Sequence, residues 1–213
     1  MESQGINQLT ADTAGRQSLG GKVDDREPIT VKPENHEKSP VHDPGILRAY
    51  REALKNGTVN DDRILVSACL AGMNCCYDGG SNLSDSIRKL VLDGRAVPVC
   101  PEQLGGLPTP RIPAEIFGGD GRGVLQGSSR VLNKLGDDVS DQFIRGAERT
   151  LEIAVSSCVS LAVLKSKSPS CGVGKIYDGT FTGITKKGDG TTAAKLRDAG
   201  IAVFSEDEWR MSE

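Results

Sequence analysis

The strongest constraint on the fold is an alternation of short apolar runs with patterns of helical period. The apolar runs are ILVSACL (64–70), AVPVC (96–100), LAVLKS (161–166) and IAVF (201–204). Because they are short and rich in β-branched residues, they predict buried strands. The helical patterns occupy residues 83–94, 137–157 and 191–200. Such alternation predicts a mainly parallel sheet with helices on its faces, a three-layer, Rossmann-like α/β domain, with irregular structure over the glycine-rich residues 104–128.

A polar segment precedes this domain. Residues 1–43 are rich in charged residues, Gln, Gly, Ser and Pro and contain almost no apolar clusters, which predicts a disordered tail. The segment DPGILRAYREALKNG (43–57) has apolar residues at helical spacing, a proline near its start and a glycine at its end, so it predicts a short helix. We therefore expect a tail over 1–43 and one folded domain over 44–213.

Composition restricts the compartment and the partners. The formal net charge of −3 and the 4% of aromatic residues disfavour a general nucleic-acid binder, which usually presents a basic surface. No run approaches the roughly 18 apolar residues of a membrane span, and the N-terminus lacks the apolar core of a signal peptide. We expect a cytoplasmic protein, in which the 6 cysteines indicate metal, cluster or catalytic chemistry rather than disulfides, with buried apolar thiols as the alternative.

Three cysteines follow three of the predicted strands. Cys69 and Cys100 end the first two apolar runs, and Cys171 lies in the loop KSKSPSCGVG (165–174) after the third. In open parallel sheets, ligands bind outside the carboxyl ends of the strands. We therefore expect these three thiols to converge on one site, the alternative being three small buried side chains.

The remaining residues limit what such a site could hold. Both histidines, His36 and His42, lie in the predicted tail, so the domain offers no Cys/His zinc site and no Cys–His or Ser–His nucleophilic pair. A zinc site of four thiolates stays open, because Cys75 or Cys76 could supply a fourth ligand. Three thiolates without a fourth suit an iron–sulfur cluster with one open iron, which is a Lewis acid.

Several motifs match one family in the same order. They are S-A-C-L-A-G with Y-D-G (67–79), V-C-P-E-Q-L-G-G-L-P-T-P-R (99–111), R-V with G-D-D-V-S-D-Q-F (130–143) and L-K-S-K-S-P-S-C-G (164–172). Over about residues 63–206 the chain resembles the thiouracil desulfidase (TudS-like) family, long known only as a domain of unknown function. The resemblance implies a [4Fe-4S] cluster on Cys69, Cys100 and Cys171 and an enzyme that converts thiolated pyrimidines to the oxo form with release of sulfide.

The resemblance also implies two catalytic residues, Glu102 and Ser168. Replacing a C=S sulfur by oxygen needs a thiophilic acceptor, an activated water and a proton donor. Glu102 lies two residues after Cys100, close enough to a cluster to act as general base on water. Ser168 precedes Cys171 by three residues and could bind the substrate or relay a proton. Taken alone, the first would be a surface carboxylate and the second a turn residue.

Other residues carry weaker expectations. Cys158, between a helical pattern and an apolar run, is expected in the core. Arg111 is expected either to bind an anionic group of the substrate or to pair with Glu115. The chain departs from the family pattern at Cys76, where many relatives have arginine before Tyr-Asp-Gly.

Two alternative functions remain open on the sequence. One is a non-catalytic zinc or iron–sulfur binding module, and the other is a tRNA thio-modification enzyme that uses the same cluster. The substrate of the favoured enzyme is a small thiolated pyrimidine, either a base, a nucleoside or a nucleotide.

Overall fold

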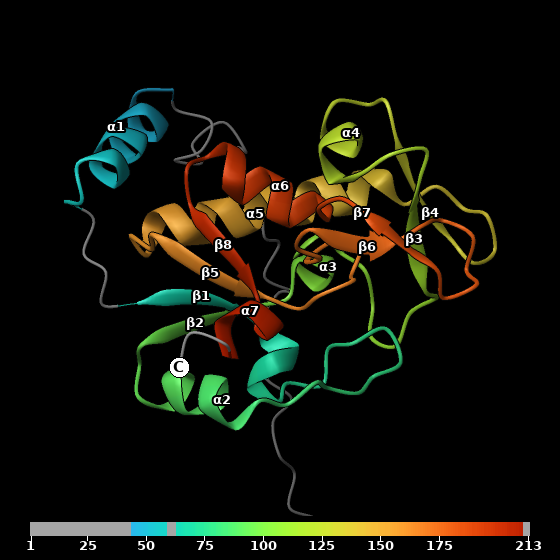
Figure 1. Cartoon of the computed structure of the whole chain (residues 1–213), viewed down its shortest axis with the longest axis horizontal. Coiled ribbons are helices and arrows are strands. Elements are labelled where there is room, and N and C mark those ends of the chain that lie inside the picture. The colour runs from blue at the N-terminus through green and yellow to red at the C-terminus, as the bar shows by residue number, and fades with distance from the viewer. Residues whose placement is uncertain (1–43, 59–62, 211–213) are drawn as a thin grey trace, which may run out of the picture. The chain divides into compact units, whose positions relative to one another are not determined.

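A parallel sheet of four strands forms the centre of the described structure (Figure 1). The computed structural model describes residues 44–58 and 63–210, so the tail predicted over 1–43 lies outside the described residues. The strand order is β2-β1-β5-β8, and each neighbouring pair is parallel. The strands are β1 (Ile64–Ser67), β2 (Ala96–Val99), β5 (Leu161–Leu164) and β8 (Ala202–Ser205). The predicted parallel sheet is confirmed.

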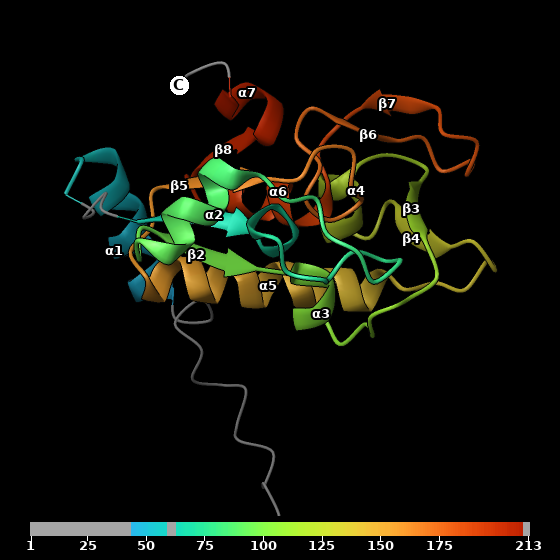
Figure 2. The same ribbon diagram turned by 90° about the horizontal axis from the view of Figure 1, so that it is seen from below.

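Helices cover both faces of this sheet. One face packs against α1 (Pro44–Lys55), α5 (Ser140–Ser156) and α6 (Thr191–Asp198). The other packs against α2 (Asp85–Leu92) and α7 (Glu206–Arg210). Successive residues of β1 point to opposite faces, so Leu65 joins the first core and Val66 the second. Figure 2 shows α5 on one side and α2 and α7 on the other, which confirms the predicted three layers.

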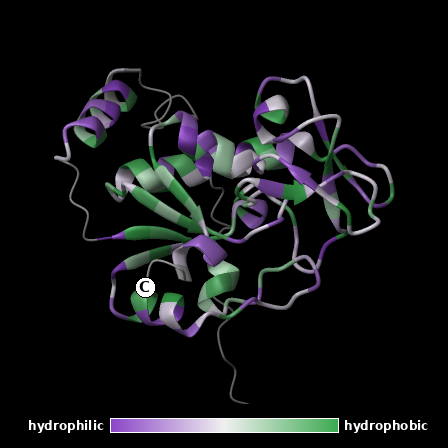
Figure 3. Cartoon of the chain, viewed as in Figure 1, coloured by the Kyte–Doolittle hydropathy of each residue, from purple (hydrophilic) through white to green (hydrophobic). Residues whose placement is uncertain are grey.

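Burial on both faces explains why the strands read as continuous apolar runs. In Figure 3 the four strands are hydrophobic along most of their length, whereas the helices carry both colours. The first strand ends earlier than predicted, because the chain turns at Ala68–Ala71 into a 3₁₀ helix, η2, which contains Cys69. Gly72 ends η2 with a φ of 89°, a conformation that favours glycine. No helix of the described residues is both long and apolar enough to cross a membrane.

Two antiparallel hairpins lie beyond the carboxyl ends of the parallel strands (Figure 1). They are β3 (Ala114–Phe117) with β4 (Arg130–Asn133), and β6 (Lys175–Tyr177) with β7 (Thr185–Lys187). With α4 (Gly121–Leu125) they enclose a third core of Ile116, Val124, Val131, Phe143 and Ile176. The irregular structure predicted over 104–128 is therefore wrong for β3 and α4. These short elements are stabilised by residues far away in the sequence, which local patterns do not reveal.

A close contact between two backbones places the short helix α3 (Pro101–Leu104), which follows Cys100. A Cβ atom at Gly146 of α5 would lie 2.1 Å from the carbonyl oxygen of Pro101, and one at Gly105 would lie 1.9 Å from that of Gln142. Only glycine allows this approach. The side chain of Arg149 in α5 also donates to the carbonyl of Leu104, at 2.7 Å. Helix α5 therefore fixes the position of α3.

Replacing Gly146 by alanine tests this contact. In an ordinary helix interior, Gly→Ala stabilises by about 1 kcal/mol. Here we expect Gly146→Ala to lower the free energy of unfolding by about 1–3 kcal/mol, because the methyl group must displace α3. Urea unfolding of the apoprotein measures the change. Ser156→Ala, at an exposed position of the same helix, is the control and should change stability little; a stabilised Gly146→Ala protein would contradict the close packing.

Candidate functional site

A cavity of about 570 Å³ opens at the carboxyl ends of β1, β2 and β5. All five residues that the sequence singled out line it, and these are Cys69, Cys100, Glu102, Ser168 and Cys171. From β1 the chain continues to β2, which lies on one side of β1 in the sheet, and later enters β5, which lies on the other side. The direction in which successive strands are added therefore reverses between β1 and β5. Open α/β sheets bind ligands at such a reversal. The three cysteines that were expected to converge at the sheet edge thus line one cavity.

Each of the three thiols comes from a different local structure. Cys69 is held in η2 and is buried. Cys100 precedes the first turn of α3, where Pro101 begins the helix. Cys171 is buried in a turn in which the N–H of Gly172 donates to the carbonyl of Ser168, at 2.8 Å. Three rigid backbone features thus direct the sulfur atoms toward one cavity.

The hydroxyl of Ser67 connects the ends of two strands at this point. It accepts a hydrogen bond from the N–H of Lys165, at 2.9 Å, and also contacts the thiol of Cys171. Its side chain is buried, and the residue is the last of β1. The sequence analysis did not identify Ser67, since only the pairing of β1 with β5 brings it beside Cys171.

A fourth thiol, that of Cys75, lies among the first three. It hydrogen-bonds to Cys69 and Cys100, and this contact lowers the pKa of Cys100 to about 7 and also lowers the pKa of Cys69. Burial raises the pKa of Cys171 well above its ordinary value. Among residues 44–58 and 63–210, no group of three His, Cys, Asp or Glu side chains is arranged to hold a single metal ion.

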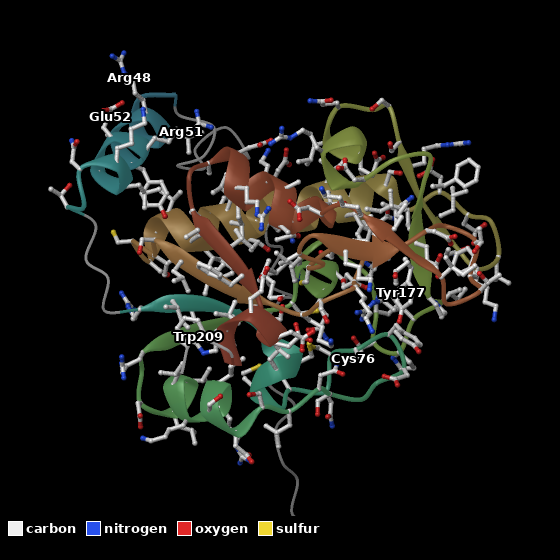
Figure 4. The ribbon with its side chains drawn as sticks, in the orientation of Figure 1. Arg48, Arg51, Glu52, Cys76, Tyr177 and Trp209 are labelled. Carbon is white, nitrogen blue, oxygen red and sulfur yellow. The ribbon has the colours of Figure 1, made fainter. Side chains whose placement is uncertain are left out.

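Cys76 also lines the cavity, as does Tyr177 of β6. Figure 4 shows both at the edge of the sheet where the parallel strands end. The Cys76 sulfur accepts a hydrogen bond from the side-chain amide of Asn82, at 3.0 Å. Burial raises the pKa of Cys76 to about 11, so the thiol stays protonated at neutral pH. It contributes a neutral wall to the cavity.

An ion pair holds Glu102 in the wall. Its Oε2 accepts a hydrogen bond from Nε of Arg111, at 2.6 Å, and the two side chains are 16% and 6% exposed. The expected pair between Arg111 and Glu115 is therefore wrong. Glu115 instead accepts the backbone N–H groups of Gly179 and Phe181, at 2.9 and 3.1 Å. Arg111 and Glu102 come together because the loop after α3 folds back over that helix, which spacing alone does not indicate.

Ser168 lies between Glu102 and the turn of Cys171. Its hydroxyl oxygen accepts the backbone N–H groups of Ser170 and Cys171, each at 3.1 Å. The same hydroxyl lies 3.5 Å from Oε1 of Glu102, which it can approach as a donor. Ser168 is thus both a turn residue and a neighbour of the carboxylate.

The segment that leads to Ser168 is anchored by α7. The buried carboxylate of Glu206 accepts a hydrogen bond from the backbone N–H of Ser166, at 2.6 Å, and pairs with the ammonium of Lys165. Burial raises the pKa of Glu206, but these hydrogen bonds outweigh it and hold that pKa below its ordinary value. No signal in the sequence pointed to this anchor, because Glu206 meets residues 165–166 only through the pairing of β5 with β8.

Removing this charge should have a pH-dependent cost. Because the folded-state pKa of Glu206 is lowered, its stabilisation is present above the unfolded pKa and is lost as pH falls through the folded one. We expect Glu206→Gln to lower the free energy of unfolding by about 2 kcal/mol at pH 7. The difference from the parent protein should shrink below the ordinary carboxyl pKa. Urea unfolding at several pH values measures it, and a difference independent of pH would contradict the role of the charge.

Cys158 departs from expectation. It was predicted in the core, but it is exposed, and its φ of 53° places it in the turn between α5 and β5. Its neighbour Val159 is the buried residue, and the hydroxyl of Tyr50 in α1 donates to the Val159 carbonyl. Cys158 lies outside the set of residues that line the cavity.

Comparisons with known proteins agree on one family. The sequence model of the 2-thiouracil desulfurase family matches residues 64–208. The uncharacterized protein YbbK of Bacillus subtilis (strain 168) is 50% identical over 145 residues, which are 68% of this chain and 96% of that protein. A solved structure of the [4Fe-4S]-dependent thiouracil desulfidase TudS is 44% identical, with a TM-score of 0.62, and the match covers 71% of this chain and 95% of that one. The family match includes every residue that lines the cavity.

Proposed function

Because the chain belongs to the 2-thiouracil desulfurase family, we propose that it is a [4Fe-4S]-dependent enzyme that desulfurates thiolated pyrimidines. The product is the oxo-pyrimidine, and the sulfur leaves as sulfide. The observation that carries the proposal is one cavity in which Cys69, Cys100 and Cys171, from three separate segments, meet Glu102 and Ser168, with Cys75 and Cys76 also in the lining. The substrate is a thiolated base, nucleoside or nucleotide.

The donor set fits an iron–sulfur cluster. We assign Cys69, Cys100 and Cys171 as its ligands, since thiolates are the usual ligands of such clusters and these three bring sulfur atoms into one cavity from the carboxyl ends of three separate strands. When bound through three thiolates, the cluster supplies an open, thiophilic iron for the sulfur of the thiocarbonyl group. Cys75 is assigned no ligand role and lies within hydrogen-bonding distance of Cys69 and Cys100.

The chain's own residues supply the proton transfers. Glu102 acts as general base on the water whose oxygen adds to the thiocarbonyl carbon. Its Oε2 is occupied by Arg111, so Oε1 is the oxygen left for the water. Ser168, next to Oε1, binds the substrate or relays the proton. The C–O bond forms, the C–S bond breaks, and the sulfur leaves as hydrosulfide, with no net change in oxidation state.

The reducing cytoplasm is the compartment in which we expect this chemistry. All six cysteines are free in the structure, and an open cluster is sensitive to oxygen. The acidic balance of the chain disfavours general nucleic-acid binding, and with it the tRNA-modifying alternative.

Anaerobic purification followed by two assays tests the function. Iron and acid-labile sulfide per chain report the cluster, and sulfide released from 2-thiouracil and 4-thiouracil reports turnover. A protein that binds iron or zinc but releases no sulfide from thiolated bases, nucleosides or nucleotides would be a binding module instead.

Alanine variants of the cysteines test the cluster ligands. We expect Cys69→Ala, Cys100→Ala and Cys171→Ala each to abolish iron incorporation, because each removes one of three thiolates. Cys75→Ala and the exposed Cys158→Ala should keep their iron. Iron per chain after anaerobic reconstitution is the measurement. If Cys75→Ala also yields iron-free protein, the cluster has a fourth protein ligand and no open iron.

A separate variant tests the general base. Glu102→Gln keeps the size of the side chain but cannot accept a proton, so we expect full iron with kcat lowered by about 10²–10⁴-fold. Iron per chain and sulfide release are measured on the same anaerobic sample. Full iron with kcat within about threefold of the parent enzyme would remove Glu102 from this role.

A further inference from the structure

We infer that Arg111 is a positioning residue for the desulfuration reaction, which fixes the direction of the Glu102 carboxylate. The inference rests on the proposed function and adds a residue to it. It is carried by the contacts of one buried guanidinium group that joins three parts of the cavity wall.

Each of the three nitrogens of the guanidinium group donates hydrogen bonds to a different part of the cavity wall. Nε donates to Oε2 of Glu102 at 2.6 Å. Nη1 donates to the hydroxyl of Thr109 at 3.1 Å and to the carbonyl of Pro108 at 3.3 Å. Nη2 donates to the carbonyl of Cys75 at 3.0 Å. The group therefore connects α3, the loop after it, and the segment that carries the fourth thiol.

Backbone contacts hold Arg111 in this place. Its own N–H donates to the carbonyl of Tyr77, at 2.7 Å. The side chain of Gln103, next to Glu102, donates to the hydroxyl of Thr109 at 2.9 Å. Arg111 lines the cavity, but its side chain is only 6% exposed, and each of its three side-chain nitrogens already donates to a protein acceptor. These bonds favour a role toward Glu102 over the other role expected from the sequence, the binding of an anionic group of the substrate.

The result is that the two oxygens of Glu102 have different surroundings. Oε2 is tied to Arg111, while Oε1 points toward the hydroxyl of Ser168, 3.5 Å away. Without the arginine, the carboxylate could rotate about its last bond to angles at which neither oxygen faces Ser168. A fixed rotation keeps Oε1 directed at the position from which a water must be deprotonated.

Lysine cannot replace this function, although it keeps the charge. An ammonium group is a single point on a flexible stem, whereas the planar guanidinium holds its donors in fixed directions. Arg111→Lys therefore separates the geometry from the charge. It leaves a cation beside Glu102 and removes the simultaneous bonds to Thr109 and Cys75.

The experiment compares Arg111→Lys with the parent enzyme after anaerobic reconstitution. We expect iron per chain to be unchanged, KM for 2-thiouracil to stay within about threefold, and kcat to fall by about 10–10²-fold, the size of effect that a small misplacement of a catalytic group produces. The matched control is Arg149→Lys, because Arg149 donates to the carbonyl of Leu104 on the same short helix without touching Glu102. Its kcat should stay within about twofold of the parent value.

A double variant shows whether Arg111 acts through Glu102. In the Glu102→Gln background, Arg111→Lys should lower kcat no further, because the base it positions is already gone. In the apoprotein, each single variant should lower the urea midpoint. The decrease in the double variant should be smaller than the sum of the two single decreases. This second measurement needs no cluster.

The outcomes separate the inference from the function on which it rests. Losses in kcat that multiply in the double variant would overturn the positioning role. A second result would also overturn it. If iron per chain fell in proportion to activity in both Arg111→Lys and Arg111→Gln, the role of Arg111 would be structural. A parent enzyme that carries the cluster but desulfurates none of the thiolated pyrimidines would overturn the proposed function and this inference together.

Discussion

The reversal of strand order between β1 and β5 is the constraint on which the rest of the structure depends. Since the chain leaves these two adjacent strands in opposite directions, nothing local closes the space beyond their carboxyl ends. The loops after β1, β2 and β5 line that space, and the two antiparallel hairpins complete its walls. Ser67 joins the two strand ends at the reversal, because its hydroxyl accepts the Lys165 N–H from the neighbouring strand end. A cavity at this edge follows from topology before any residue of the site is considered.

Side chains that bond to the backbone of a distant segment hold the site together. Glu206 binds the N–H of Ser166, and Arg111 binds the carbonyl of Cys75. Ser168 binds the N–H groups of its own turn. Each of these bonds fixes a segment that carries a thiol or the carboxylate, and buried hydrogen bonds to charged groups are among the stronger ones in proteins. Such support keeps the reacting groups in place before a substrate arrives.

The sequence predicted the parallel sheet and the meeting of Cys69, Cys100 and Cys171, because strand periodicity and strand ends are local signals. It did not predict β3 and β6, since their stability comes from contacts such as those of Ile116 and Ile176 in the third core, which depend on distant residues. Family resemblance, rather than spacing, distinguished Glu102 and Ser168 from ordinary loop residues. The partner of Arg111 was mistaken for a similar reason, because Glu115 is nearer along the chain than Glu102 and only the path of the loop brings the more distant carboxylate to the arginine.

The surroundings of the cavity also bear on the proposed role of Glu102 as the base. Glu115 lines the same cavity, but the backbone N–H groups of Gly179 and Phe181, which its Oε2 accepts, tie that side chain to the turn after β6. Lys165 is paired with Glu206, and burial raises the pKa of Cys76 to about 11, so the Cys76 thiol keeps its proton at neutral pH. Glu102 retains an oxygen that faces Ser168. Its pairing with Arg111 fixes the direction of the carboxylate. In the proposed reaction, a carboxylate beside a hydroxyl is the least elaborate arrangement that can both remove a proton from water and return one to the departing sulfur.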